Sequence, residues 1–255
     1  MTVSTDLAAA YKQDGFLTGL DLFSPAEIAR FRAAFDQLEA RDGREKCQIG
    51  LVNWHFQEEF IWQMAADPRL LDLIQQVMGE DVLLLATHFF CKYPDQEGKK
   101  FVAWHQDITY WGLEPPVAHT AWIAVDDSDI ANGCMQVIPG THQSGIAPHA
   151  KSARQGNLLS INQEIPDEHV DKSKVVHLEL KAGQLSIHEG QLYHASHPNT
   201  SPRRRCGLTV RFIPPNARQV MLNSTGQAWK PLLMRGADRF RHYPDTPAPF
   251  PLPTR

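Results

Sequence analysis

The chain has few cysteines and lacks both an extended basic run and an extended apolar run. Its four cysteines lie far apart and form no C-x-x-C pair: Cys47, Cys91, Cys134 and Cys206. This spacing excludes a disulfide framework and predicts reduced thiols in a cytoplasmic protein. The formal net charge is -4, and Arg203-Arg204-Arg205 is the one basic triplet. Nucleic acid is therefore not an expected partner.

No apolar run reaches the roughly 20 residues that a membrane-spanning helix needs, so a membrane is not an expected partner either. Residues 1–14 contain an alanine-rich patch but neither the basic start nor the apolar core of a signal peptide. The sequence predicts an enzyme or binding protein for small molecules. It does not indicate an oligomeric state.

A length of 255 residues suits one domain with a sizeable core. No internal repeat and no low-complexity linker divides the chain. We therefore expect a single domain over residues 1–255, with a mostly helical part at 1–80, a strand-rich core at 81–213 and a C-terminal extension at 214–255.

Three helices are predicted in the first 80 residues, and the first has Ser4 as a possible cap and ends near Gly15. Ser24-Pro25 followed by Glu27 predicts a capped start of the second, and the apolar residues Ile28, Phe31, Phe35 and Leu38 then recur at helical spacing. Asp67-Pro68 predicts the start of the third, and Gly79 its stop. Residues 46–61 show no clear period, so they are predicted to form either a connecting loop or one wall of a pocket.

Short apolar runs predict strands at 82–90, 120–125, 134–138, 175–180, 185–188 and 208–213. The Asn132-Gly133 turn predicts that 134–138 pairs with 120–125, and 208–213 is expected to alternate as a last strand. Residues 141–174 are polar and irregular, which predicts a lid, a binding loop or a mobile excursion. Helices followed by many short strands favour a mainly β fold with flanking α-helices, either a sandwich or a barrel.

The Trp104-His105-Gln106-Asp107 stretch can carry metal chemistry. In an extended strand His105 and Asp107 leave on the same face, so an imidazole and a carboxylate can point into one cavity. A second imidazole would complete the facial triad of a non-haem Fe(II) oxygenase, which leaves three coordination positions open. His188, His194 and His197 compete for that place, and strand parity does not decide between them.

Three motifs together resemble the phytanoyl-CoA dioxygenase family. They are Trp104–Asp107, Asn132–His142, and His194-Ala195-Ser196-His197-Pro198-Asn199-Thr200-Ser201 with Arg205. The likeness extends from Leu83 to Phe212. It implies an Fe(II)- and 2-oxoglutarate-dependent oxygenase built on a double-stranded β-helix, that is, a jelly-roll or cupin-like core.

The resemblance also implies roles for individual residues. His105, Asp107 and His194 would bind the iron, and Arg205 would pair with the distal carboxylate of 2-oxoglutarate, with Arg204 as its rival. A guanidinium suits that task because it is planar, permanently charged and able to donate two parallel hydrogen bonds. Further positions near the cosubstrate would be Ser196 and Trp122 and, with weaker support, His88 and Lys92.

The implied reaction is hydroxylation of an unactivated C–H bond in a small metabolite or natural-product intermediate, with consumption of O2 and release of succinate and CO2. Asp107 favours hydroxylation because related halogenases carry a small residue in its place. Desaturation or cyclisation at the same site is an alternative. A non-catalytic cupin-like binding module and a zinc-dependent hydrolase or isomerase are others. An acyl-CoA substrate is not favoured, since no basic groove for the nucleotide is evident.

Overall fold

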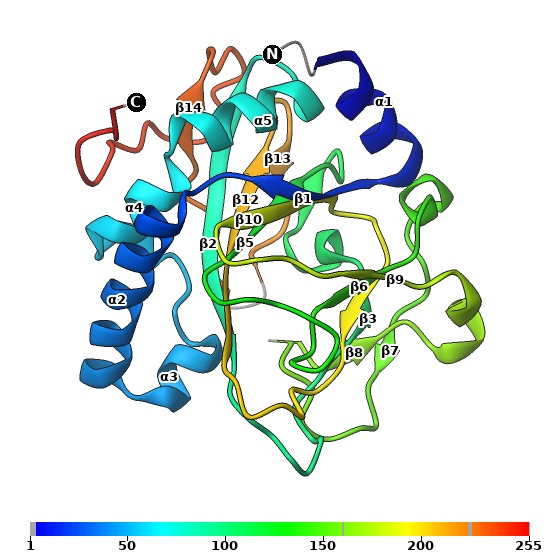
Figure 1. Cartoon of the computed structure of the whole chain (residues 1–255). Coiled ribbons are helices and arrows are strands. Elements are labelled where there is room, and N and C mark those ends of the chain that lie inside the picture. Colours follow the sequence, from blue (N-terminus) through cyan, green and yellow to red (C-terminus); the bar gives the residue numbers. More distant parts are fainter. Residues whose placement is uncertain (1–3, 160, 224–225, 255) are drawn as a thin grey trace.

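The computed structural model describes residues 4–159, 161–223 and 226–254 (Figure 1). Its α-helices are α1 (Ser4–Asp14), α2 (Pro25–Asp42), α3 (Arg44–Ile49), α4 (Glu59–Ala65) and α5 (Pro68–Met78). In these described ranges, no helix combines the length and the apolar character that crossing a membrane requires.

All three predicted helices are present as α1, α2 and α5, and α2 and α5 have the predicted start signals. At the start of α2 the Ser24 hydroxyl accepts a hydrogen bond from the Glu27 backbone at 3.3 Å, and the Glu27 carboxylate accepts one from the Ser24 backbone at 2.7 Å. This reciprocal capping box satisfies two N–H groups that the helix itself cannot pair. Helix α5 begins after Asp67, whose side chain caps it, and ends at Gly79.

The prediction of an irregular stretch at 46–61 is wrong in part. The stretch contains the end of α3, a 3-10 turn at Trp54–Phe56 and the start of α4, elements too short to show a helical period. The pocket alternative is not supported, because this segment packs against strand β2. His55 Nδ1 lies 2.8 Å from the Thr87 hydroxyl, and the Asn53 side chain accepts a hydrogen bond from the Thr87 backbone.

Two antiparallel sheets form the core. The six-stranded sheet has the order β1-β10-β5-β12-β2-β14, with bounds Phe16–Asp21, Gln184–Glu189, His119–Ala124, Arg205–Ile213, Val82–Lys92 and Leu232–Arg235. The four-stranded sheet has the order β3-β11-β6-β9, with bounds Val102–His105, His194–Ser196, Met135–Val137 and Val176–Leu178. Two short pairs complete the described strands: β4 (Leu113–Glu114) with β13 (Arg218–Gln219), and β7 (Ala150–Lys151) with β8 (Gln163–Glu164).

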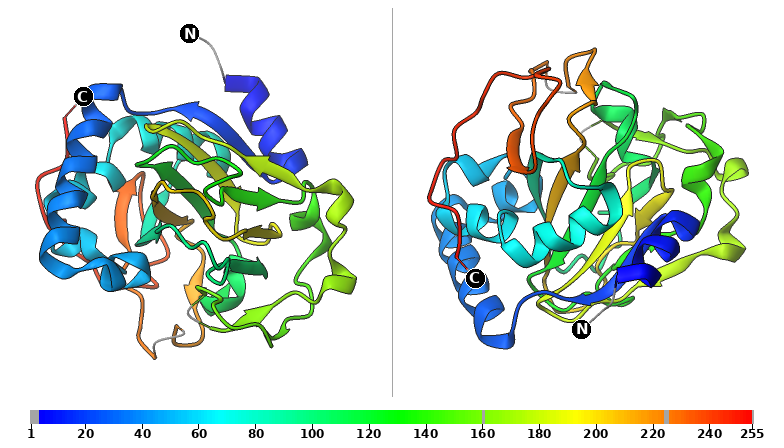
Figure 2. Two further views of the ribbon diagram at one scale, coloured as in Figure 1. Left: turned by 60° about the horizontal axis from the view of Figure 1, so that its bottom comes forward. Right: turned by 90° about the horizontal axis from the view of Figure 1, so that it is seen from above.

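The six-stranded sheet lies between the helices and the four-stranded sheet (Figures 1 and 2). Its helix-facing side contributes to the largest apolar cluster, which includes Phe35 of α2, Trp62 of α4, Ile74 of α5 and Phe212 of β12. Its other side faces the four-stranded sheet. This arrangement confirms the predicted mainly β, double-stranded β-helix fold with flanking helices.

The predicted pairing of 134–138 with 120–125 is wrong. Strand β6 pairs with β11 and β9 in the four-stranded sheet, whereas β5 pairs with β10 and β12 in the six-stranded sheet. The Asn132 side chain donates to the Asp127 carbonyl and accepts from the Asp129 backbone, both at 2.8 Å. These bonds fold the connection into a compact loop that leads from one sheet to the other, so Asn132-Gly133 does not close a hairpin.

The prediction for the last strand is wrong in two respects. Strand β12 does not alternate between buried and exposed positions, because all nine of its residues are buried between the helices and the cavity side of the sheet. Nor is it the last strand. Leu232–Arg235 in the C-terminal extension forms β14, which pairs with β2 at the edge of the six-stranded sheet.

Candidate active site

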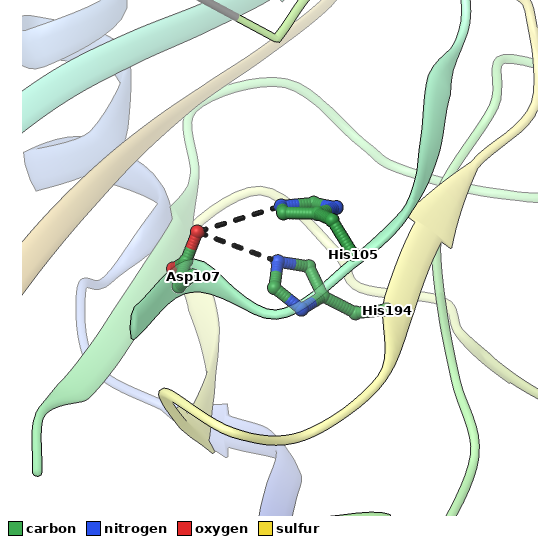
Figure 3. A group of neighbouring side chains, drawn as sticks. All are labelled: His105, Asp107 and His194. Atoms are coloured by element: carbon green, nitrogen blue, oxygen red, sulfur yellow. Dashed lines mark ion pairs between the residues drawn. The ribbon is translucent and has the colours of Figure 1, made fainter. Parts of the chain in front are cut away.

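Three of the predicted site residues come together between the two sheets (Figure 3). His105 ends β3 and His194 begins β11, and the antiparallel register places these two residues directly opposite each other. Asp107 does not lie on the strand, contrary to prediction, because β3 stops at His105 and Asp107 begins a 3-10 helix (Asp107–Tyr110). The extended backbone of Gln106 nonetheless carries Asp107 back to the same cavity.

The three side chains converge on one point. His105 Nε2 and His194 Nε2 lie 3.4 and 3.7 Å from the same carboxylate oxygen, Asp107 Oδ1, and Figure 3 marks both contacts. All three residues are buried, and their ligand atoms lie within 4.8 Å of one another. The spacing is that of three donors around a single metal ion.

The orientation of both rings supports this reading. His105 Nδ1 lies 2.8 Å from the Ala103 carbonyl, and His194 Nδ1 lies 3.0 Å from the Leu192 carbonyl. A carbonyl can only accept, so each Nδ1 carries the hydrogen, and in a neutral imidazole Nε2 then presents a lone pair. Two such lone pairs facing a carboxylate oxygen form an arrangement that a cation stabilises. The residues present fit an Fe(II) ion.

The electrostatics also favour a metal-binding protonation state. Burial lowers the pKa of His194 well below its usual value, with further contributions from His105 and His188, so this imidazole is neutral. Burial alone would raise the pKa of Asp107, but the three neighbouring histidines and Arg211 hold it well below its usual value. Asp107 is therefore ionised at neutral pH.

Asp107 is also held from its other oxygen. The Thr120 hydroxyl donates to Asp107 Oδ2 at 3.1 Å, and His188 Nε2 lies 3.5 Å from the same atom. His188 thus borders the site without joining the three-residue cluster. His197 is exposed, and its carbonyl accepts a hydrogen bond from Lys92. Of the three competing histidines, His194 is the one that the fold brings to His105 and Asp107.

Arg205 lies on the cavity side of β12 and is only 3% exposed. It donates to the Gly133 carbonyl at 2.7 Å, and its guanidinium carbon lies 5.0 Å from the centre of the Trp122 ring. Trp122 can lie here because Gly207 has no side chain; a Cβ on Gly207 would stand 2.0 Å from the ring. Burial lowers the pKa of Arg205 to about 10, which still leaves it charged at neutral pH.

Lys92 is a second buried basic side chain beside Arg205. Its ammonium donates to the Ser196 hydroxyl at 2.6 Å and to the carbonyls of Ser196 and His197. Burial, and next the charge of Arg205, lower the pKa of Lys92 well below its usual value. Among the residues that the structure describes, neither Lys92 nor Arg205 forms an ion pair with a carboxylate. A carboxylate bound at this end of the cavity would offset the free-energy cost of burying Lys92 and that of burying Arg205.

One cavity joins the two ends of the site. Its walls include His105, Asp107 and His194 at one end and Ser196, Arg205 and Trp122 at the other. The predicted metal ligands and the predicted cosubstrate residues therefore line the same cavity.

The rival positions have other partners. Arg204 points away from the cavity and pairs with Asp126 at 2.8 Å and Asp36 at 2.7 Å. Arg203 pairs with Asp129 at the surface. His88 Nε2 lies 2.7 Å from the Ile49 carbonyl, so this predicted cosubstrate candidate holds the chain before β2 instead.

Sequence reasoning missed the contact of Thr120 with Asp107 and that of Lys92 with Ser196. Thr120 and Lys92 both stand in runs that are otherwise apolar and buried. A polar or charged side chain in such a run needs a partner, and that requirement was the available signal.

The comparisons with known proteins agree with this geometry. A family model described as Phytanoyl-CoA dioxygenase (PhyH) matches residues 11–207. The chain is 26% identical over 240 residues to the peroxisomal phytanoyl-CoA dioxygenase of Bos taurus, covering 85% of this chain and 70% of that protein. It is also 26% identical over 247 residues to an ectoine dioxygenase of Bordetella parapertussis, covering 87% of this chain and 78% of that protein.

Among solved structures, the chain is similar to apo ThoJ, described as a non-heme monooxygenase. The TM-score is 0.77 at 26% identity, over 95% of this chain and 87% of the other. EctD from S. alaskensis, solved with 2-oxoglutarate and 5-hydroxyectoine, matches with a TM-score of 0.69 at 22% identity, over 85% of this chain and 78% of the other. The second likeness shows a shared fold.

Proposed function

Because the chain belongs to the phytanoyl-CoA dioxygenase family, we propose that His105, Asp107 and His194 hold its iron and that Arg205 holds the distal carboxylate of its cosubstrate. The protein is an Fe(II)- and 2-oxoglutarate-dependent dioxygenase that acts on a small molecule with O2. The observation that carries the residue assignment is the buried cluster in which two Nε2 lone pairs and Asp107 Oδ1 face one point.

The residues at the two ends of the cavity have different roles. When bound, Fe(II) and 2-oxoglutarate would supply the electrons that activate O2, with 2-oxoglutarate converted to succinate and CO2. Ala103 and Leu192 fix the imidazole orientation through their carbonyls, and Thr120 fixes the carboxylate of Asp107. These contacts are made before any ligand arrives, so the donors need little reorganisation on binding.

At the other end, Lys92, Ser196 and Arg205 form the carboxylate site, and Trp122 forms its wall. Burial excludes water, which strengthens the attraction between the guanidinium and a carboxylate. We propose that Ser196 orients Lys92 and contributes its hydroxyl to the same carboxylate.

We propose hydroxylation of an unactivated C–H bond of a metabolite or natural-product intermediate as the reaction. The support is Asp107, whose carboxylate completes the facial donor set. We further propose that residues 1–255 form one domain acting in the cytoplasm. The continuous apolar cluster that joins helices to both halves of the six-stranded sheet supports the former, and four free, buried cysteines support the latter.

An anaerobic titration tests the assignment without knowledge of the substrate. Fe(II) and then 2-oxoglutarate are added, and the visible metal-to-ligand charge-transfer band of the chelate is recorded. We expect a saturable band in the wild type, no band in His105→Ala, and a 2-oxoglutarate Kd raised about 100-fold in Arg205→Gln, the loss of a charge-assisted pair.

Arg203→Gln is the matched control, because it removes a neighbouring arginine that pairs with Asp129 at the surface. It should titrate like the wild type. An absent band in folded, iron-loaded wild-type protein would overturn the assignment of this cavity to 2-oxoglutarate.

A further inference from the structure

A second buried arginine lines the cavity, on the same face of β12 as Arg205. Arg211 is 8% exposed and lies six residues further along the strand. That separation corresponds to about 20 Å between the two Cα atoms at the usual rise of a strand. Arg211 is thus too far along β12 to share the carboxylate site of Arg205.

Arg211 lies level with the metal cluster. The antiparallel registers place Arg211, Thr120 and His188 in one row across β12, β5 and β10. Thr120 and His188 are the two residues that contact Asp107 Oδ2. A group bound to Arg211 would therefore lie beside the proposed iron site.

The guanidinium of Arg211 has no protein partner that accounts for its burial. It donates no hydrogen bond to any residue within the described ranges, and its Nε is fully buried without a partner. Neither does it form an ion pair with a described carboxylate; Asp107 acts on it only at longer range. Burying a charge without a partner costs free energy unless a bound ligand supplies the opposite charge.

The surroundings hold the guanidinium in place and leave its N–H groups for a ligand. Its central carbon lies 5.3 Å from the centre of the Trp111 ring. Trp111 is itself fixed, because the Trp229 indole donates to its carbonyl at 3.0 Å. An arginine stacked in this way is pre-organised, so it loses little conformational freedom when it binds an anion.

The charge balance of the cavity leaves room for an anion. The two positive charges of Fe(II) are offset by Asp107 and by one carboxylate of 2-oxoglutarate, and Arg205 offsets the other carboxylate. The positive charge of Arg211 then remains unbalanced, whether or not Lys92 is also charged. One further negative charge would balance it.

The neighbouring groups favour a singly charged ligand. The Thr209 hydroxyl donates to the His88 carbonyl, and Thr120 donates to Asp107, so neither offers its hydrogen elsewhere. Burial lowers the pKa of His88 to about 3, so this histidine is neutral. One guanidinium without a second cation beside it matches a carboxylate better than a doubly charged phosphate.

We propose that Arg211 anchors a carboxylate of the primary substrate, and that the enzyme therefore oxidises small organic acids. This inference rests on the proposed function. Binding at Arg211 would hold the acid by its charged end, in the row of the sheet that contacts the metal cluster. Arg211 is thus a specificity-determining residue, distinct from the cosubstrate arginine.

The test uses matched acids and amides as probes: hexanoate and hexanamide, cyclohexanecarboxylate and its amide, phenylacetate and phenylacetamide. Each is titrated calorimetrically into the anaerobic protein loaded with Fe(II) and 2-oxoglutarate. We expect the best acid to bind at least ten times more tightly than its amide. Arg211→Gln should weaken that acid about 10- to 100-fold, the loss of a charged hydrogen bond, and leave the amide unchanged.

Arg211→Lys keeps the charge but not the planar donor pair, so it should recover part of the preference for acids. Arg218→Gln is the matched control, because it removes an exposed arginine that pairs with Glu114, and it should behave as the wild type. In all these variants the 2-oxoglutarate chelate should form with wild-type affinity, which also shows that each variant is folded.

Equal affinity for acids and amides, or no binding of any acid, would overturn the proposal. So would an Arg211→Gln variant that weakens 2-oxoglutarate as strongly as Arg205→Gln, since Arg211 would then belong to the cosubstrate site. A wild-type protein that forms no chelate would instead reject the proposed function. The two failures are therefore distinguishable.

Discussion

The two faces of β12 are equally buried but differ in chemistry. Cys206, Leu208, Val210 and Phe212 face the helices and join the largest apolar cluster, whereas Arg205, Thr209 and Arg211 face the cavity. The first set gains stability by leaving water. The second gives up stability, because the two guanidinium groups are buried without an ion pair to any described carboxylate. Burial alone thus does not distinguish core from site; the polarity of the buried groups does.

The largest effect should come from the helix-facing side. Phe212 is fully buried, and Phe212→Ala should lower the free energy of unfolding by about 3–5 kcal/mol because it leaves a cavity. Urea unfolding measures this change. Affinity for 2-oxoglutarate in the folded protein should stay within twofold of the wild type, and Phe212→Leu should cost much less. A large loss of affinity in Phe212→Ala would show that the two faces are coupled.

A buried titratable group on the helix-facing side should make stability depend on pH. His55 is 0% exposed, and burial lowers its pKa to about 4 from an ordinary value of 6.5. Because the unfolded chain takes up a proton at higher pH than the folded one, stability is complete above pH 6.5 and declines toward pH 4. The decline from this residue is at most about 3 kcal/mol.

Urea unfolding of wild type and His55→Leu between pH 4 and 7.5 checks this effect. The variant should show a flatter dependence over the lower part of that range. His169→Gln, at an exposed position, should leave the dependence unchanged. An identical slope in His55→Leu and wild type would assign the pH effect to other groups.

A smaller effect is expected where the cavity face is tightly packed. A methyl group on Gly207 would meet the Trp122 ring at 2.0 Å, so Gly207→Ala should cost about 1–3 kcal/mol through overpacking. It should also raise the Kd for 2-oxoglutarate, because Trp122 must move from beneath Arg205. In a Trp122→Leu background Gly207→Ala should cost less stability. If the effects of the two substitutions simply add, the methyl group does not clash directly with the Trp122 ring.

The smallest effect should come from the arginine that lies outside both faces. Arg203 is half exposed where it pairs with Asp129, so Arg203→Ala should change stability by less than about 1 kcal/mol. Thermal unfolding at low and high salt measures it. A loss as large as that of Phe212→Ala would mean that the turn before β12 supports the sheet.

The sequence predicted the parts of the fold that local chemistry determines. The capping box at Ser24 and the stop at Gly79 depend on residues close in the chain, and both predictions are confirmed. The partner of Met135–Val137 depends on how the loop after β5 crosses between sheets, which no local pattern specifies. The hairpin prediction was wrong for that reason.

In the candidate site, too, the sequence predicted what depends on nearby residues and missed what depends on strand register. Spacing indicated that His105 and Asp107 could share a cavity, and the choice of His194 over His188 came from a family resemblance. The contact of Thr120 with Asp107 and the isolation of Arg211 depend on strand register, which becomes visible only in three dimensions. The assignment of these residues to iron and 2-oxoglutarate stays a prediction.

Strand β14 has a practical consequence for anyone who shortens this protein. Leu232–Arg235 covers the outer edge of β2 by pairing with it opposite Val82, Leu83 and Leu84. A fragment that stops after β12 would leave the backbone donors and acceptors of that apolar strand open to solvent and to other chains. Open strand edges of this kind recruit further strands. Such a fragment should aggregate even though it retains every residue of the candidate site.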